Sequence, residues 1–269
     1  MLAATGRIGA LARLVLVDGL RRYALLGLVA LALAVELSGL FFFAFVPRDI
    51  GRVAVDFIVT GGWAAGLIFL FFHAVQVMSW GENRRVIHTL LSHPLSRTEY
   101  VLGVFGGLLV LLLLLDGLLA ALGYGVLLLI KSWVSAVYFE QLGLVAYVLA
   151  WAGVLATQMV LLAAIVLFSG MLRGTFTVLL VSLAYYLICN GLPVALEFFR
   201  EGAPLMRRFL QGLTLLFPNF SVYDYKGLVV ATGNLPAWSQ LAEQLAFVLL
   251  YAVLVLTVAA AVYNRRDLK

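Results

Sequence analysis

Six long apolar runs constrain this chain more than any other feature of its sequence. A helix needs about 20 mostly apolar residues to cross the hydrocarbon core of a bilayer, and six stretches meet that requirement: 23–46, 57–79, 101–130, 142–172, 175–198 and 241–263. Of the 269 residues, 64% are hydrophobic and 12% are charged, whereas a soluble domain is roughly 45–50% apolar and 25% charged. We therefore predict an all-α integral membrane protein, in which residues 1–269 form a single domain with six transmembrane helices.

The distribution of Lys and Arg predicts how these helices are oriented. Positively charged residues near helix ends are retained in the cytoplasm. Eleven of the 18 Lys and Arg residues lie before the first run, between the second and third, between the fourth and fifth, or after the last. We therefore expect both termini to be cytoplasmic. Because the basic residues are scattered rather than clustered, they do not predict a surface that binds nucleic acid.

Two segments outside the apolar runs are predicted to lie at the membrane surface. Residues 4–22 place Arg7 and Asp18 near one face, which predicts an N-terminal interfacial helix. Between the fifth and sixth runs, residues 199–240 carry apolar side chains at helical spacing: Leu205, Met206, Phe209, Leu210, Leu213 and Leu216. This pattern predicts an outer interfacial or re-entrant segment, and Pro193 is expected to break the fifth helix, so that the end of that helix joins this segment.

The segment between the second and third runs contains a recognisable helix start. Ser96-Arg97-Thr98-Glu99 matches a capping box, in which Ser96 and Glu99 each use a side-chain oxygen to accept from the other's amide. Pro94 interrupts the helical pattern that precedes it. Residues 82–92 are then left as a short helix that carries Glu82, Arg84, Arg85 and His88. We predict a stiff cytoplasmic helix, joined by a turn to the third transmembrane helix.

The sequence contains no motif typical of catalysis. A phosphate-binding loop needs a second glycine directly before its Lys, and the nearest approach, Gly125 to Ser132, has Ile130 at that position. The motifs of metalloproteases and serine hydrolases are also missing. His88 and His93 lack the carboxylates or thiolates of a metal site. We expect no catalytic residues, no metal ligands and no bound cofactor in this chain.

Two carboxylates fall within the apolar runs, Glu36 in the first and Asp116 in the third. An ionisable group at the bilayer centre costs a few kcal/mol unless it is paired or hydrated. The other polar side chains within reach are His73, Gln76, Gln158 and Asn190. These residues form either a translocation path or proton relay, or a set of interhelical hydrogen bonds that fix the packing.

Two pairs of glycines are spaced for close contact between helices. Gly62 with Gly66, and Gly103 with Gly107, leave three residues between small side chains, a spacing that allows two backbones to approach. Because the chain contains 25 glycines, such pairs arise easily. Packing within the chain is therefore favoured over a dimer seam.

Residues 82–102, which read ENRRVIHTLLSHPLSRTEYVL, resemble the cytoplasmic loop of ABC-2 type transporter permeases. Members of this family carry an acidic residue, a turn, and then a sequence of the form L-L-S-x-P-[VL]-S-R before the third helix, which Leu90 to Arg97 match closely. The Gly-Thr usually found upstream is replaced by Arg85-Val86. Leu216-Phe217-Pro218-Asn219-Phe220 also looks like the outer segment of the branch named for multicopper-enzyme maturation.

The resemblance implies the membrane subunit of an ATP-driven exporter in the bacterial cytoplasmic (inner) membrane, surrounded by lipid. Such a permease supplies half of the pore, which implies a second copy of the chain, or a related permease, and two copies of an ABC ATPase that bind ATP and Mg. The residues implied to couple to the ATPase are Glu82, Arg84, Arg85, His88, Ser92, Pro94, Leu95, Ser96, Arg97 and Glu99. The alternatives are a stand-alone proton-coupled transporter or channel that uses Glu36 and Asp116, and a membrane scaffold without transport activity.

Overall fold

The computed structural model describes residues 2–21, 50–83, 96–134, 142–199, 204–214, 216–229 and 236–265, together with 26, 27, 29, 30, 32–35, 37 and 139. The regular elements of this part of the chain are all helical. They are α1 (Leu2–Arg21), α3 (Ile50–Ile68), the π-helical turn η2 (Phe69–Ala74), α4 (Val75–Asn83), α6 (Arg97–Trp133), α7 (Leu144–Met171), α8 (Thr175–Phe198), α9 (Pro204–Leu213), the short 3-10 turns η4 (Phe220–Tyr223) and η5 (Lys226–Leu228), and α10 (Trp238–Arg265).

Five of the described helical stretches are long and apolar enough to cross a membrane. They are Ile50–Ser79, Arg97–Trp133, Leu144–Met171, Thr175–Phe198 and Trp238–Arg265. These correspond to the second through sixth predicted spans, although the second begins at residue 50 rather than 57. The all-helical fold is confirmed and is compatible with a multi-pass membrane protein. The first predicted span, 23–46, lies mostly outside the described residues.

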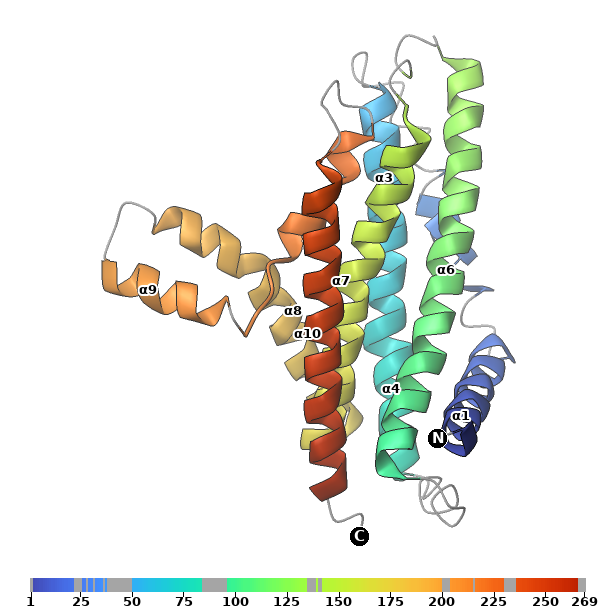
Figure 1. Cartoon of the computed structure of the whole chain (residues 1–269). Helices are drawn as coiled ribbons and strands as arrows, with labels where there is room; N and C mark the ends of the chain where they lie inside the picture. The colour runs from blue at the N-terminus through green and yellow to red at the C-terminus, as the bar shows by residue number, and fades with distance from the viewer. Residues whose placement is uncertain are drawn as a thin grey trace.

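α7 is the central helix of the bundle. Every residue from Val160 to Val166 is at most 2% exposed, and the helix contacts α3, α4, α6, α8 and α10. A helix that is apolar on all faces has this kind of position, because each face needs an apolar neighbour. Figure 1 shows α7 between α10 and α3, with α6 on the far side of α3.

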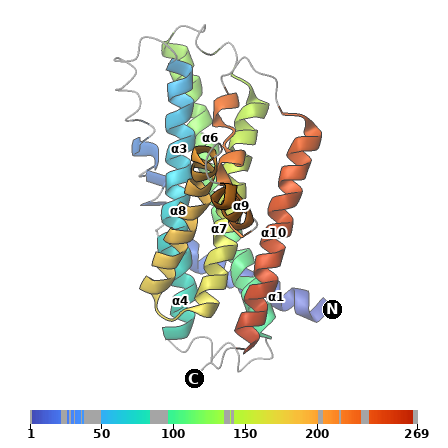
Figure 2. The same cartoon turned by 90° about the vertical axis from the view of Figure 1, so that its left-hand side faces the viewer.

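α1 lies against α6 across the lower part of the bundle (Figures 1 and 2). Its buried face contains Leu11 and Val15. These side chains sit over Gly103 and Gly107, where an added Cβ would lie 2.8 Å from Leu11 and 2.7 Å from Val15. The helix predicted over residues 4–22 is therefore present and uses the Gly103 and Gly107 pair for contact within the chain.

The second glycine pair lets α7 approach α3 in the same way. An added Cβ at Gly62 would clash with the ring of Trp151, and one at Gly66 would clash with the side-chain amide of Gln158. Both pairs thus serve packing within the chain, as the sequence favoured.

The expectation that Pro193 would break the fifth helix is wrong. α8 continues through Pro193 to Phe198, which is the end predicted for the fifth span. A proline inside a helix removes one backbone hydrogen bond and bends the helix, and membrane-spanning helices tolerate this when neighbouring groups compensate. Figure 1 shows the C-terminal part of α8 leaving the bundle and running beside α9.

The helix predicted within residues 199–240 is present as α9, whose Leu205 and Phe209 are exposed. After α9, residues 218–229 fold back against the bundle. Phe220, Tyr223 and Tyr225 are buried, and Gly153 of α7 leaves room for the backbone carbonyl of Tyr223. This return brings polar loop residues onto α7.

Candidate functional site

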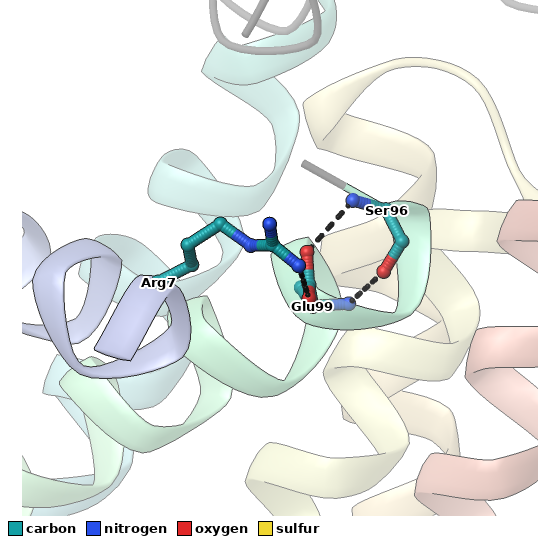
Figure 3. A network of polar contacts seen from close by, with 3 residues as sticks. All are labelled: Arg7, Ser96 and Glu99. Carbon is teal, nitrogen blue, oxygen red and sulfur yellow. Dashed lines mark hydrogen bonds and ion pairs between the residues drawn. The ribbon is translucent and has the colours of Figure 1, made fainter. Parts of the chain in front are cut away.

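The start of α6 is held by the capping box that the sequence predicts. Ser96 Oγ accepts from the Glu99 amide at 3.2 Å, and Glu99 Oε2 accepts from the Ser96 amide at 2.9 Å. The other carboxylate oxygen of Glu99, Oε1, accepts from Arg7 Nη2 of α1 at 2.6 Å. Figure 3 shows the three side chains converging on the first turn of α6. Glu99 therefore joins the cap of α6 to α1.

Arg97 connects the same turn to α10. Its Nη1 donates to the backbone carbonyls of Tyr263 and Asn264, at 3.0 and 3.1 Å. The last carbonyls of a helix have no partner within the helix and carry a partial negative charge, so a guanidinium suits this position. Asn264 Nδ2 also donates to Thr98 Oγ1 at 3.3 Å. The beginning of α6 and the end of α10 are thus fastened together.

Tyr263 extends these contacts to α7. Its hydroxyl lies 2.9 Å from Ser169 Oγ in a buried hydrogen bond, and its ring fills the space left by Gly170. The ring of Tyr100 is tilted against the ring of Tyr263, with the ring centroids 6.3 Å apart. We call this group the junction; its members are Arg7, Ser96, Arg97, Glu99, Ser169, Tyr263 and Asn264. It joins α1, α6, α7 and α10 at one end of the bundle.

Most of the expected ATPase-coupling residues fall outside the described part of the chain. These are Arg84, Arg85, His88, Ser92, Pro94 and Leu95. Glu82 lies in the last turn of α4, but the placement of its side chain is not described. The structure brings Ser96, Arg97 and Glu99 together at the junction, where the contacts described for them are made within this chain.

Asp116 and Gln158 lie together inside the bundle. Asp116 on α6 is 4% exposed and Gln158 on α7 is 1% exposed, and the Gln158 amide interacts with the Asp116 carboxyl. Within the described part of the chain, neither side chain makes a hydrogen bond of normal geometry. Gly66 leaves the space that Gln158 occupies. Polar pairs of this kind connect helices inside a bilayer.

The other polar residues predicted within the spans are His73, Gln76, Asn190 and Glu36. His73 lies in the π-helical turn η2, where its ring is tilted against Phe69 with the centroids 5.1 Å apart. Gln76 is half-buried one turn further along the same helix, and Glu36 lies outside the described residues. Asn190 donates from Nδ2 to the Tyr186 carbonyl at 2.9 Å.

A cavity of about 260 Å³ lies between α3, α7, α8 and residues 220–226. Thr60, Thr157 and Asn190 line it, and Asp224 and Lys226 lie at its rim. The cavity therefore brings together side chains from both halves of the sequence.

Four aromatic residues line this cavity beside aliphatic ones. They are Trp63, Tyr186, Phe220 and Tyr223, with 6.0 Å between the ring centroids of Trp63 and Tyr186 and 6.2 Å between those of Tyr186 and Phe220. Burial raises the pKa of Tyr223 to about 12, so its hydroxyl remains neutral at physiological pH. Asn190 is among the polar residues predicted from the sequence, whereas these rings are not, because aromatic residues in an apolar run look the same whether they face lipid, core or cavity.

The described residues thus offer a charged junction, a buried polar pair and an aromatic cavity. They contain no group of three or more His, Cys, Asp or Glu side chains that could hold a metal ion. Comparison with models of known protein families and with curated proteins finds no match for this chain.

Proposed function

We propose that this chain is the transmembrane permease subunit of an ABC-2 type exporter, driven by a separate ATPase that binds ATP and Mg. The observation that carries the proposal is the junction. The motif Leu90 to Arg97, which matches the permease loop most closely, leads directly into the first turn of α6, and Arg97 and Glu99 in that turn bind α10 and α1. A force applied to that segment therefore acts on several helices.

The contacts of the junction suit the transmission of movement. A capped helix begins sharply, so displacement of the chain before Ser96 moves α6 rather than unwinding its first turn. α6 has 37 residues, which at 1.5 Å per residue gives a length of roughly 55 Å. The charge-assisted hydrogen bonds of Arg7 and Arg97 are stronger than neutral ones and pass the movement to α1 and α10. In this mechanism the partner hydrolyses ATP and moves the segment before Ser96, and the chain transmits that movement and provides the substrate path.

The proposed assembly contains two permease copies, or one copy with a related permease, and two ATPase subunits in the bacterial cytoplasmic membrane. α1 and the end of α10 lie at the same end of the bundle. We place that end in the cytoplasm because the excess of Lys and Arg lies on the same side.

The proposal is tested by reversing the charge of one arginine pair. Arg84→Glu with Arg85→Glu should abolish co-purification of the ATPase, because both residues lie in the proposed docking segment, while the amount of chain in the membrane should be unchanged. The matched control is Arg207→Glu with Arg208→Glu, a second adjacent pair on α9, which should retain the ATPase. Absence of any ATPase from the wild-type preparation, or loss of it in the control pair alone, would contradict the proposal.

The second candidate function is proton-coupled transport, favoured by the buried Asp116 and Gln158 pair. Vesicles that contain the purified chain, an imposed pH gradient and a pH-sensitive dye separate the two functions. A proton-coupled carrier or channel should give a proton flux that Asp116→Asn removes. The exporter should give no such flux with either the wild type or the variant.

A further inference from the structure

The aromatic cavity has the dimensions of a site for a small group. Its volume of about 260 Å³ lies just below the roughly 300 Å³ at which pockets for drug-sized ligands begin. It therefore fits a small polar molecule, or the head group of a larger molecule whose remainder stays outside.

The aromatic walls favour a cation. The faces of Trp, Tyr and Phe attract ammonium groups through the negative charge of their π-systems, and clusters of such rings recognise quaternary ammonium ligands. Here Trp63 from α3, Tyr186 from α8 and Phe220 from η4 come from separate elements and surround one space. Tyr223 adds a phenol that remains neutral.

The rim of the cavity carries one charge of each sign. Asp224 Oδ2 and Lys226 Nζ are 3.6 Å apart, and their side chains are 51% and 36% exposed. This distance is longer than the roughly 2.7–2.9 Å of a close charged hydrogen bond, so the pair is loose and both groups remain accessible to a ligand. A ligand with a single charge could pair with only one of Asp224 and Lys226, and the other would be left without a counter-charge.

We propose that this cavity binds a zwitterionic group, in which an ammonium and a phosphate are joined by a short linker. The ammonium lies among the aromatic rings with Asp224 as its counter-charge, and the phosphate meets Lys226 and accepts hydrogen bonds from Thr60 and from the second amide hydrogen of Asn190. Such a group occurs free in solution and as the head group of a zwitterionic phospholipid. The inference rests on the proposed export function, since it names the chemical class of the substrate.

The experiment is a titration of the purified full-length chain in detergent, with phosphocholine as the probe. We expect phosphocholine to bind at least tenfold more tightly than choline or inorganic phosphate, each of which supplies only one of the two charges. Trp63→Ala and Lys226→Ala should each weaken binding at least tenfold. The matched controls are Trp133→Ala and Lys131→Ala, which change exposed residues at the end of α6, and should bind as the wild type does.

Two further variants distinguish a specific loss of binding from misfolding. Trp63→Phe retains a ring and should bind within a few-fold of the wild type, and Asp224→Asn should weaken phosphocholine more than phosphate. Equal binding of choline and phosphocholine, or equal binding by the Lys226→Ala and Lys131→Ala variants, would overturn the proposal.

A second arm of the experiment distinguishes the two sources of the ligand. The chain is placed in nanodiscs with equal amounts of phosphatidylcholine and phosphatidylglycerol, and the lipid that remains bound on extraction is identified by mass spectrometry. Selective retention of phosphatidylcholine that Lys226→Ala removes supports a lipid head group, and binding of free phosphocholine alone supports a soluble substrate. If neither ligand binds while the ATPase still co-purifies, the site is wrong and the exporter proposal stands. If the ligand binds but no ATPase co-purifies, the site is supported and the exporter proposal is wrong.

Discussion

Glu99 uses its two carboxylate oxygens for two different helices. Oε2 accepts from the Ser96 amide and completes the cap of α6, while Oε1 accepts from Arg7 of α1. Arg97, two residues earlier in the chain, binds the last carbonyls of α10. The first turn of α6 therefore combines local capping with two contacts between segments distant in sequence, and each can be removed separately.

Replacing Arg97 should destabilise the end of α10. Arg97→Ala removes two hydrogen bonds to carbonyls at a helix C-terminus and should lower the free energy of unfolding by about 1–2 kcal/mol. Arg97→Lys keeps the charge but not the fork geometry, so it should recover part of this loss. Thermal unfolding of the purified chain in detergent measures both. Arg173→Ala, at an exposed position between α7 and α8, is the control and should leave Tm unchanged.

Two substitutions at Glu99 should separate its capping role from its ion pair. Glu99→Gln keeps a side-chain oxygen for the Ser96 amide, since Gln also completes a capping box, but it loses the charge that binds Arg7. Glu99→Ala loses both, so it should lower Tm more than Glu99→Gln does. Arg7→Ala should lower Tm in the wild type and have little further effect in the Glu99→Gln background. An equal effect of Arg7→Ala in both backgrounds would show that the ion pair does not contribute.

At the scale of whole elements, glycines decide how closely the chain segments approach. Gly62 and Gly66 bring α3 against α7, Gly103 and Gly107 bring α1 against α6, and Gly153 accommodates the backbone after η4. None of these contacts depends on a positive φ. Each glycine is required because a neighbouring side chain or backbone occupies the position of its missing Cβ.

Gly153→Ala should displace the segment that forms the cavity rim. The added Cβ would meet the carbonyl of Tyr223, and a backbone group cannot rotate away as a side chain does. We expect a loss of about 1–3 kcal/mol in unfolding free energy, as is typical of overpacking, measured by denaturation of the purified chain in detergent. Gly125→Ala on α6 has no atom within 4 Å of its Cβ, and should leave the unfolding free energy unchanged.

Features that depend on residues close in sequence are predicted correctly, whereas contacts between residues distant in sequence are not. The capping box depends on residues three apart, and it is present as predicted. The contacts of Arg7 with Glu99 and of Arg97 with Tyr263 span 92 and 166 residues, and no local pattern indicates them. Pro193 disfavours a continuous helix only as a local preference, and α8 nevertheless continues through it, because surrounding contacts can override such a preference.

At the scale of the whole molecule, helices of similar apolar composition differ in how deeply they are buried in the bundle. α7 has an unbroken buried stretch, whereas α10 exposes Leu250, Val253 and Leu254 on its outer side. A surface this apolar on a long helix favours contact with lipid, as in a membrane-spanning bundle. The apolar runs predict helices that are long and apolar enough to span a membrane, but they do not reveal which helix lies at the centre, because both kinds are apolar along their length.

The orientation of the bundle in the membrane can be measured directly, because Cys189 is the only cysteine in the chain and is buried. In a Cys189→Ser background, Ser132→Cys at the end of α6 and Ser239→Cys at the start of α10 should react with a membrane-impermeant maleimide in intact cells. Arg173→Cys, between α7 and α8, should react only after the membrane is permeabilised, because the distribution of Lys and Arg predicts that this end is cytoplasmic. All three positions are exposed, so a difference in labelling reports the side of the membrane and not burial. The opposite labelling pattern would show that the bundle has the inverse orientation. The junction would then lie outside the cell, where it could not couple to a cytoplasmic ATPase.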